Sequence, residues 1–470
     1  RENNILINVR GSAGGSLLLY LLGVSAVNPL RHNLSFERFL TLGRIKANTL
    51  PDVDIDISAT GRDKVIEYLQ NKYKDGFCRI STDSLLKLKS SIKDAERAIL
   101  GNVTNETEKL CKSLPSEPQG VDSKEFVKGF TDSNGNYHQG LIEQNQELKN
   151  YAKNNPKIWQ TVIEMLGIIR QKSSHACGVV IANEPIQNYC PVMKINDVVL
   201  TGFSPKSVEL AGLVKYDLLG LNTLVDIQGC LESIRQRLDI KIDPWTLPYC
   251  HKSFAAFQIG RTETVFQFDT ETVKPFLISI KPKSIEDLAA ITSLARPGTL
   301  DAPFGDGRTL AEVYVARKNG EDITYINKDL EPILKDTAGI NLYQEQTIQI
   351  FRELAGFTAE EAEDVRRAIG KKDEKLLSVA TRRLKNSCLK RGWSESEVDL
   401  LIEQIMASSR YSFNKSHAIS YAYVAYACMY LKTNYPLDWW KSVLSNSSKD
   451  SLSMALSMAL RCLSIDFCMR

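Results

Sequence analysis

The first part of the chain contains short apolar runs and a segment in which polar and apolar residues alternate, a pattern that predicts strands and helices joined by turns. Residues 5–9 are apolar and branched, and a Gly/Ser-rich stretch at residues 10–16 leads into a second apolar run at residues 17–22. This order predicts a strand, a turn and a helix. Residues 50–57 alternate between acidic and apolar side chains, which predicts a further strand with its acids on one face. Apolar residues at helical spacing then predict a helix at about residues 62–73.

The rest of the pattern is mainly helical. Residues 84–171 have few strand signals and a loop-like stretch at residues 115–135, which favours an inserted helical subdomain. Strand character returns at residues 178–182 and 212–217, and from about residue 222 onward the pattern is almost wholly helical. The predicted fold class is therefore α+β, with a mixed sheet split by a helical insertion and followed by a large helical domain.

Composition limits the class of protein. The 470 residues suggest about three domains, and hydrophobic and charged fractions of 43% and 24% are ordinary for a globular protein. Because the net charge is only +3, any surface that binds nucleic acid must be local. Ten scattered cysteines without a CxxC pair favour reduced thiols and a cytoplasmic location.

Two apolar segments and the first residue complete this picture. Residues 17–27 and 418–431 are too short to cross a bilayer, so we expect both to be core helices and expect no membrane partner. The chain starts at Arg1, just before a predicted strand, so we also expect it to be a piece of a longer protein.

The alternating acids are the strongest chemical signal. Asp52, Asp54 and Asp56 project from one face of the predicted strand, and their mutual repulsion favours a bound divalent cation. Such a pair of carboxylates can bridge two Mg²⁺ ions, although solvated surface acids or a structural calcium site remain alternatives. Asp217 is a candidate third carboxylate, with Lys215 on the same strand face. The alternative for these two residues is an exposed ion pair.

Other segments have parts that suit phosphate. The small residues at 10–16 precede a helix and would let backbone N–H groups approach an anion, although a plain tight turn has the same composition. Thr358 and Glu361 have the spacing of a capping box and predict a helix start. From residue 366 to residue 391 there are ten basic and two acidic residues, which indicates either a phosphate-binding face or a solvated helix face.

Residues 411–417 precede a predicted helix that runs to about residue 431. They combine aromatic rings, a lysine, hydrogen-bonding groups and His417, which are suitable parts for holding a base, a sugar and phosphates. A histidine in this position is also compatible with a helix cap or a core residue, and His175 has the same ambiguity.

Together these segments resemble the catalytic alpha subunits of bacterial DNA polymerase III, the C-family replicative polymerases. The likeness runs in order along most of the chain. It is carried by Arg10-Gly11-Ser12, by Phe36-Glu37-Arg38-Phe39, by the acidic run at 51–56, by residues 175–182 and 213–217, by Val265-Phe266-Gln267, by Arg296-Pro297-Gly298, and by residues 342–346, 366–372 and 413–417.

The resemblance implies a polymerase-beta-like nucleotidyltransferase palm at residues 1–83 and 173–222, a helical thumb insertion at residues 84–172, and helical fingers at residues 223–470. Carried over by motif, the catalytic and metal-binding residues are Asp52, Asp54 and Asp217. The residues expected to bind the incoming nucleotide are Arg10, Gly11, Ser12, Arg38, Lys215, Arg366, Arg367 and His417. The residues expected to contact DNA are Lys89, Lys371, Lys372 and Lys415.

The implied function is template-directed DNA synthesis, in which dNTPs are added to a primer 3′ end with two Mg²⁺ ions and release of pyrophosphate. The implied partners are primer-template DNA, dNTPs, and a sliding clamp and other replisome proteins that would bind through regions absent from this chain. Val9, Cys177 and residues 80–84 depart from the family's pattern and favour a divergent member, with a virus as one source. Two other functions stay open: an inactive polymerase-like protein that binds nucleic acid, and a nucleotidyltransferase that needs no template.

Overall fold

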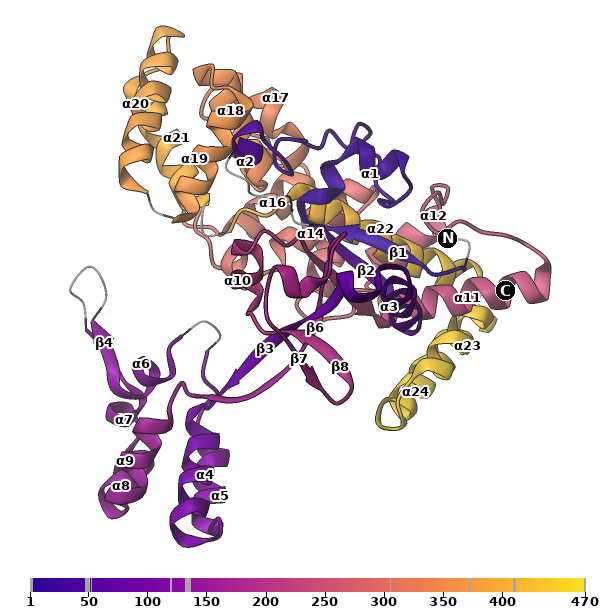
Figure 1. Cartoon of the computed structure of the whole chain (residues 1–470). Helices are drawn as coiled ribbons and strands as arrows, with labels where there is room; N and C mark the ends of the chain where they lie inside the picture. The colour runs from indigo at the N-terminus through magenta and orange to yellow at the C-terminus, as the bar shows by residue number, and fades with distance from the viewer. Residues whose placement is uncertain are drawn as a thin grey trace. The chain divides into compact units, whose positions relative to one another are not determined.

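The computed structural model describes residues 3–46, 51, 53–118, 121–131, 137–304, 306–371, 373–408 and 411–468. The chain forms two compact units, one made of Arg1–Lys72 with Tyr216–Arg470 and the other of Tyr73–Lys215. Each unit combines strands with helices, so the predicted α+β class is confirmed (Figure 1). The units group residues differently from the predicted palm, thumb and fingers, whose boundaries stay a prediction.

Three strands of the first unit pair with one another. β1 (Ile7–Arg10) is antiparallel to β2 (Asp54–Ser58), and β2 is parallel to β9 (Lys215–Leu221). β1 and β2 are the two strands that the apolar run and the alternating acids predict. The pairing of β2 with β9 joins segments that are far apart in the sequence.

Helices make up most of the first unit. Its first segment contains the short 3-10 helix η1 (Gly11–Gly15), followed by the helices α1 (Leu17–Leu21), α2 (Leu42–Lys46) and α3 (Ala59–Tyr73). Those after β9 are α11 (Asn222–Leu238), α12 (His251–Gln258), α13 (Val273–Ile280), α14 (Ile285–Leu294), α15 (Pro297–Leu300), α16 (Leu310–Lys318), α17 (Glu331–Leu334), α18 (Gln344–Ala355), α19 (Ala359–Lys371), α20 (Glu374–Lys390), α21 (Glu395–Ser408), α22 (Lys415–Asn434), α23 (Pro436–Asn446) and α24 (Lys449–Cys468).

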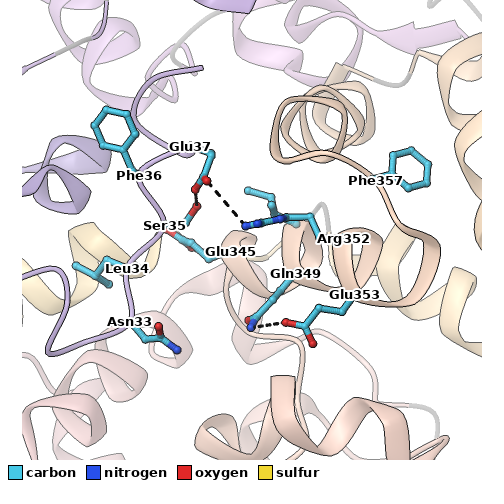
Figure 2. Close-up of a pocket in the computed structure, with 11 residues that line it drawn as sticks. Asn33, Leu34, Ser35, Phe36, Glu37, Glu345, Gln349, Arg352, Glu353 and Phe357 are labelled. Carbon is cyan, nitrogen blue, oxygen red and sulfur yellow. Dashed lines mark hydrogen bonds and ion pairs between the residues drawn. The ribbon is translucent and has the colours of Figure 1, made fainter. Parts of the chain in front are cut away.

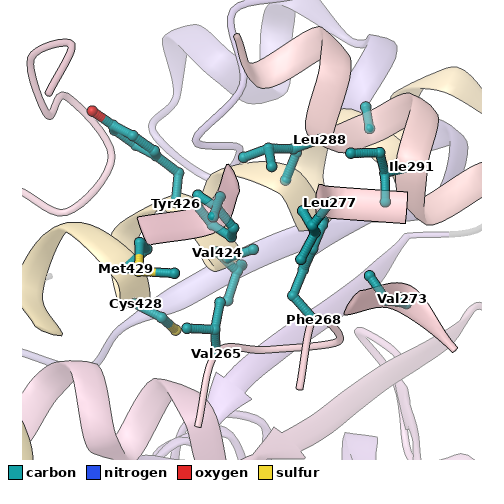
Figure 3. Packing of buried hydrophobic residues seen from close by; sticks show 14 of the residues in the cluster. Val265, Phe268, Val273, Leu277, Leu288, Ile291, Val424, Tyr426, Cys428 and Met429 are labelled. Carbon is teal, nitrogen blue, oxygen red and sulfur yellow. The ribbon is translucent and has the colours of Figure 1, made fainter. Parts of the chain in front are cut away.

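Helix α22 lies at the centre of the largest core. Asn414 caps its N-terminus by accepting a hydrogen bond from the His417 N–H at 2.7 Å, and Pro436 starts the next helix. Fourteen of its twenty residues are buried, and most of these are small or apolar, as expected for a helix that is covered on most sides. It packs against α12, α14 and β1, and Figure 3 shows its Val424 and Met429 among side chains from residues 265–291. The prediction of a core helix at 418–431 is confirmed.

A second core is formed by α18, α19, α20 and α21. The predicted capping box starts α19: the Thr358 N–H donates to Glu361 Oε2 at 2.8 Å, and the Glu361 N–H donates to Thr358 Oγ1 at 3.2 Å. Two otherwise unpaired donors of the first turn are satisfied in this way. The local sequence therefore fixes where the helix that contains Arg366 and Arg367 begins.

The prediction that residues 17–27 form a core helix is wrong. α1 covers only Leu17–Leu21, and Leu18 and Leu21 are 64% and 72% exposed. Leu19 alone among these leucines packs against the small cluster around Val9 and Phe39. Consecutive leucines show no periodicity, so the pattern could not indicate which of them would face a neighbour.

Among its described residues, the second unit has a group of helices and six strands, of which β4 and β5 pair only with each other. β3 (Phe77–Leu85) pairs with β6 (Ile169–Ile181) antiparallel and with β8 (Val198–Thr201) parallel, and β7 (Val192–Ile195) is antiparallel to β8. Between β3 and β6 the chain forms α4 (Leu88–Leu100), α5 (Asn105–Ser113), α6 (Ser123–Lys128), β4 (Gly129–Thr131), β5 (Tyr137–Gln139), α7 (Leu141–Gln144), α8 (Gln146–Asn154) and α9 (Pro156–Met165). α10 (Pro205–Leu210) follows β8. The helices lie beyond one end of β3 and β6 and have their own core (Figure 1).

Two local predictions in this unit need correction. The stretch at 115–135 is not wholly a loop, because it contains α6, whose first turn is capped by the Asp122 carboxylate, and β4. β6 begins at Ile169, well before the predicted start at residue 178. The apolar pattern missed its first half because that half is polar and only the end of the strand is buried. Across the part of the chain that the structure describes, we find no helix with the length and hydropathy of a membrane span.

Candidate active site

Two of the three predicted metal-binding acids lie side by side in the first unit. Asp54 on β2 is the register partner of Asp217 on β9. Aligned residues of paired parallel strands point to the same face, and neighbouring strands are about 5 Å apart. The two carboxylates therefore project from one face at adjacent positions. Asp52, the third predicted acid, lies outside the described residues.

Arg10 is the counterion of the acids on β2. It is the register partner of Asp54, and its Nε lies 3.7 Å from Asp54 Oδ2 and 3.8 Å from Asp56 Oδ1. Its Nη1 donates a hydrogen bond to the Tyr421 hydroxyl at 3.2 Å. Burial raises the pKa of Asp56 to about 6, with Arg10 opposing that shift. The structure therefore places Arg10, predicted to bind nucleotide, against the carboxylates themselves.

The chemistry of these side chains fits a divalent cation. Carboxylate oxygens are the ligands that Mg²⁺ prefers, and Asp54 and Asp217 offer them from neighbouring strands. Asp56 is buried two positions along the same strand, and its Oδ2 has no hydrogen-bond partner within the described chain, which leaves a further oxygen acceptor beside Asp54. Among the residues that the structure describes, which exclude Asp52, no three His, Cys, Asp or Glu side chains form a complete metal-binding group.

The small residues of η1 allow it to pack closely against the start of α22. A Cβ on Gly14 would lie 3.3 Å from the Ser416 carbonyl oxygen, and one on Gly15 would lie 2.8 Å from the Ser35 carbonyl oxygen. Gly11 has a φ of +70°, and its N–H donates to His417 Nδ1 at 3.1 Å. In the structure this N–H is therefore engaged by His417, and the role of Gly11 in binding an anion stays a prediction. Ser12 is partly buried in the same short helix.

His417 is held as a neutral ring. Its centroid lies 5.2 Å from that of Phe413 and 4.2 Å from that of Tyr421. Burial lowers its pKa to about 4, and the nearby Arg10 and Arg296 act in the same direction. Because Nδ1 accepts the Gly11 N–H, the neutral ring has its proton on Nε2. His417 therefore has one N–H donor to offer a ligand.

Arg38, Arg366 and Arg367 converge on one carboxylate that the sequence reading missed. Arg366 donates to Glu363 from Nε and Nη2 at 2.8 and 3.0 Å, and Arg367 donates from Nε at 3.2 Å. Arg38 Nη1 lies 3.7 Å from Glu363 Oε1, and the Glu363 side chain is only 1% exposed. Burial, with help from Arg366, lowers the pKa of Arg38. The signal that could have revealed Glu363 is its spacing of three and four residues before the arginines.

A cavity of about 450 Å³ lies next to this cluster, between residues 33–37 and α18 (Figure 2). Ser35 Oγ donates to Glu37 Oε2 at 2.7 Å, and Glu37 Oε1 lies 4.0 Å from Arg352 Nη1. Within α18, Gln349 Nε2 donates to Glu353 at 2.9 Å. Of these pairs, only that between Glu37 and Arg352 joins the segment just before Arg38 to α18.

The described lysines that are predicted to contact DNA lie on separate elements. Lys371 is exposed at the end of α19 and Lys415 begins α22 in the first unit, whereas Lys89 belongs to the second unit and Lys372 lies outside the described residues. Lys215 opens β9, two positions before Asp217. Several basic side chains of residues 366–391 have partners on neighbouring segments: Arg383 pairs with Glu361, Lys385 pairs with Asp399, and Arg391 donates to the Glu353 carbonyl. The basic segment is thus not one uniformly unpaired face.

Comparison with known proteins agrees with the order of these elements. The family model described as the bacterial DNA polymerase III alpha NTPase domain matches residues 1–220, and the one described as the bacterial DNA polymerase III alpha subunit finger domain matches residues 223–392. Both describe parts of one class of protein, a bacterial DNA polymerase subunit. The chain belongs to the bacterial DNA polymerase III alpha subunit family.

Curated relatives support the same assignment. DNA polymerase III subunit alpha of Aquifex aeolicus is 34% identical over 466 residues, which cover 96% of this chain and 39% of the relative. The subunit of Ureaplasma parvum is 34% identical, covering 98% and 45%, and that of Bacillus subtilis is 31% identical, covering 95% and 38%. The chain thus spans roughly two fifths of the length of these relatives. The resemblance predicted from the motifs is confirmed.

Proposed function

We propose that this chain performs template-directed DNA synthesis and adds dNTPs to a primer 3′ end with release of pyrophosphate. The observation that carries the proposal is the pairing of Asp54 with Asp217 in a chain of this family. β1, β2 and β9 would belong to a polymerase-beta-like palm. Residues 84–172 would be the thumb and residues 223–470 the fingers.

Asp54 and Asp217, with Asp52, would hold two Mg²⁺ ions. When bound, these ions would lower the pKa of the primer 3′-hydroxyl and neutralise charge on the leaving pyrophosphate. The role of the neighbouring residues is to keep these carboxylates ionised and aligned. Arg10 supports both tasks, since it lies within 4 Å of Asp54 and Asp56 and favours their charged forms.

Other side chains of the first unit suit an incoming nucleotide. Arg38, Arg366 and Arg367 offer guanidinium donors to the triphosphate, and charge-assisted bonds of this kind are strong. The neutral His417 offers its Nε2–H. Lys89, Lys371, Lys372, Lys415 and Lys215 would add contacts to DNA or nucleotide phosphates. Such contacts make DNA affinity fall as salt rises.

The test is primer extension on a defined template with Mg²⁺ and all four dNTPs. Asp54→Asn should lower the rate by at least about 100-fold, because it removes charge stabilisation at the reacting phosphate, while affinity for primer-template DNA is retained. The matched control is Asp399→Asn, which makes the same chemical change at an exposed carboxylate paired with Lys385 and should leave the rate unchanged. Near-normal extension by Asp54→Asn would refute the assigned role.

The same assay separates the other two functions. A binding protein without activity would retain DNA affinity and incorporate nothing, and an enzyme that needs no template would extend a single strand when the template is omitted. Contacts with a sliding clamp and replisome proteins, the cytoplasmic location and a viral source stay predictions.

A further inference from the structure

Glu363 organises the guanidinium groups that the proposed function assigns to the triphosphate. Its Oε1 is shared by all three arginines, since it accepts hydrogen bonds from Arg366 Nη2 at 3.0 Å and Arg367 Nε at 3.2 Å and lies 3.7 Å from Arg38 Nη1. Its Oε2 accepts from Arg366 Nε at 2.8 Å, which makes that pair bidentate. One buried carboxylate therefore fixes three cations.

The three arginines come from two distant segments. Arg366 and Arg367 follow Glu363 by three and four positions on α19, so they lie on the same helix face. Arg38 comes from the segment before α2, and its Nε also donates to Gln344 Oε1 at 3.0 Å. Glu363 thus joins α19 to the segment that contains Arg38.

Several guanidinium donors remain for an anion. Each guanidinium has five N–H donors. Among the described residues, Arg367 makes its hydrogen bond through Nε and Arg366 through Nε and Nη2, so Nη1 of Arg366 and both terminal nitrogens of Arg367 are uncommitted. The side chains of Arg366 and Arg367 are 18% and 33% exposed, so a ligand can reach them.

Nearby acids do not cancel this charge fully. Glu345 is buried near Arg38, and Asp364 lies near Arg367. Lys415 adds a further positive charge near Glu345. Three arginines and Lys415 thus face the three carboxylates of Glu363, Glu345 and Asp364, so the cluster stays cationic.

We propose that Glu363 is a positioning residue for the incoming nucleotide, an inference that rests on the proposed function. It does not meet the nucleotide. It holds Arg38, Arg366 and Arg367 in place before binding, so that the triphosphate does not have to order three long side chains. Without the carboxylate the three cations would repel one another and turn toward solvent.

The experiment compares Glu363→Gln with the wild-type chain in steady-state primer extension at saturating primer-template DNA. The variant should raise the KM for dNTP by roughly tenfold and change kcat by less than about twofold, because nucleotide binding is weakened before the chemical step. DNA affinity should match that of the Asp399→Asn control, whereas the thermal unfolding midpoint should fall, because the neutral side chain leaves three guanidinium groups without their buried carboxylate. Glu363→Asp retains the charge on a shorter side chain and should give a KM between those of the wild type and Glu363→Gln. It also keeps the test usable if Glu363→Gln folds poorly.

A double-mutant cycle tests whether Glu363 acts through its neighbours. In an Arg366→Lys background, Glu363→Gln should add far less to the KM than it does alone. An unchanged or lower KM in Glu363→Gln, an additive effect in the cycle, or the same rise in Asp399→Asn would overturn the proposal. Equilibrium binding of a fluorescent dNTP separates the two hypotheses. If the wild-type chain binds dNTP without extending a primer, the proposed function fails while the effect of Glu363 on affinity is still measured, and if it binds no dNTP both fail.

Discussion

Replacing His417 with phenylalanine tests how the loop beside the acids is held. Phenylalanine keeps an aromatic ring between Phe413 and Tyr421 but removes the Nδ1 atom that accepts the Gly11 N–H at 3.1 Å. A fully buried donor left without its partner costs about 1–3 kcal/mol, and this hydrogen bond is part-buried. We therefore expect the free energy of unfolding at pH 7 to fall by about 1 kcal/mol, the lower end of this range.

The pH dependence provides a sharper test. Burial moves the pKa of His417 from 6.5 to about 4, which corresponds to about 3 kcal/mol as an upper estimate. The unfolded chain binds a proton below pH 6.5, whereas the folded chain resists protonation until about pH 4. The titration of His417 therefore leaves the free energy of unfolding unchanged above pH 6.5 and lowers it progressively as the pH falls toward 4. Phenylalanine cannot titrate, so the stability of the wild type relative to His417→Phe should fall by up to about 3 kcal/mol over this interval, which is enough to make the variant the more stable chain near pH 4.

Urea unfolding followed by tryptophan fluorescence is the assay, because the buried Trp439 and Trp440 belong to the same unit as His417. Other titrating groups are present in both chains, so their effects on the free energy of unfolding largely cancel when the variant is subtracted from the wild type. His417→Asn is the companion variant, since its side-chain oxygen can take the place of Nδ1 and should recover part of the loss. A stability difference that stays constant from pH 7 to pH 4 would contradict the reasoning, because His417 would then titrate alike in the folded and unfolded chains.

Two further predictions concern packing and capping. Gly15→Ala should lower the free energy of unfolding by about 1–3 kcal/mol, since its Cβ would lie 2.8 Å from the Ser35 carbonyl oxygen, whereas Gly370→Ala, with no atom within 4 Å of the new Cβ, should not. Equal losses in chemical denaturation would argue against that contact. Thr358→Ala should cost about 1 kcal/mol by removing the acceptor of the Glu361 N–H, and Thr358→Ser should recover most of it. If serine behaves like alanine in the same measurement, the cap is not the cause.

Features encoded within a few residues could be predicted from the sequence. The alternating acids gave β2, the capping box gave the start of α19, and the small and apolar residues of 418–431 gave a buried helix. Each depends on spacing along the chain, which local backbone geometry converts directly into structure. The resemblance to a polymerase family also came from the order of motifs, and the comparisons confirm it.

Contacts between distant segments were decided by the tertiary structure. The sequence named Asp54, Asp217, Arg38 and Arg366 but did not show that β2 pairs with β9 in register, or that Glu363 joins the arginines. Nor did it show that Gly11 binds His417, 406 positions away, or that the leucines of α1 face outward. Periodicity states which side chains share a face, but the partner of that face is chosen by the packing of the whole unit, which local sequence does not specify.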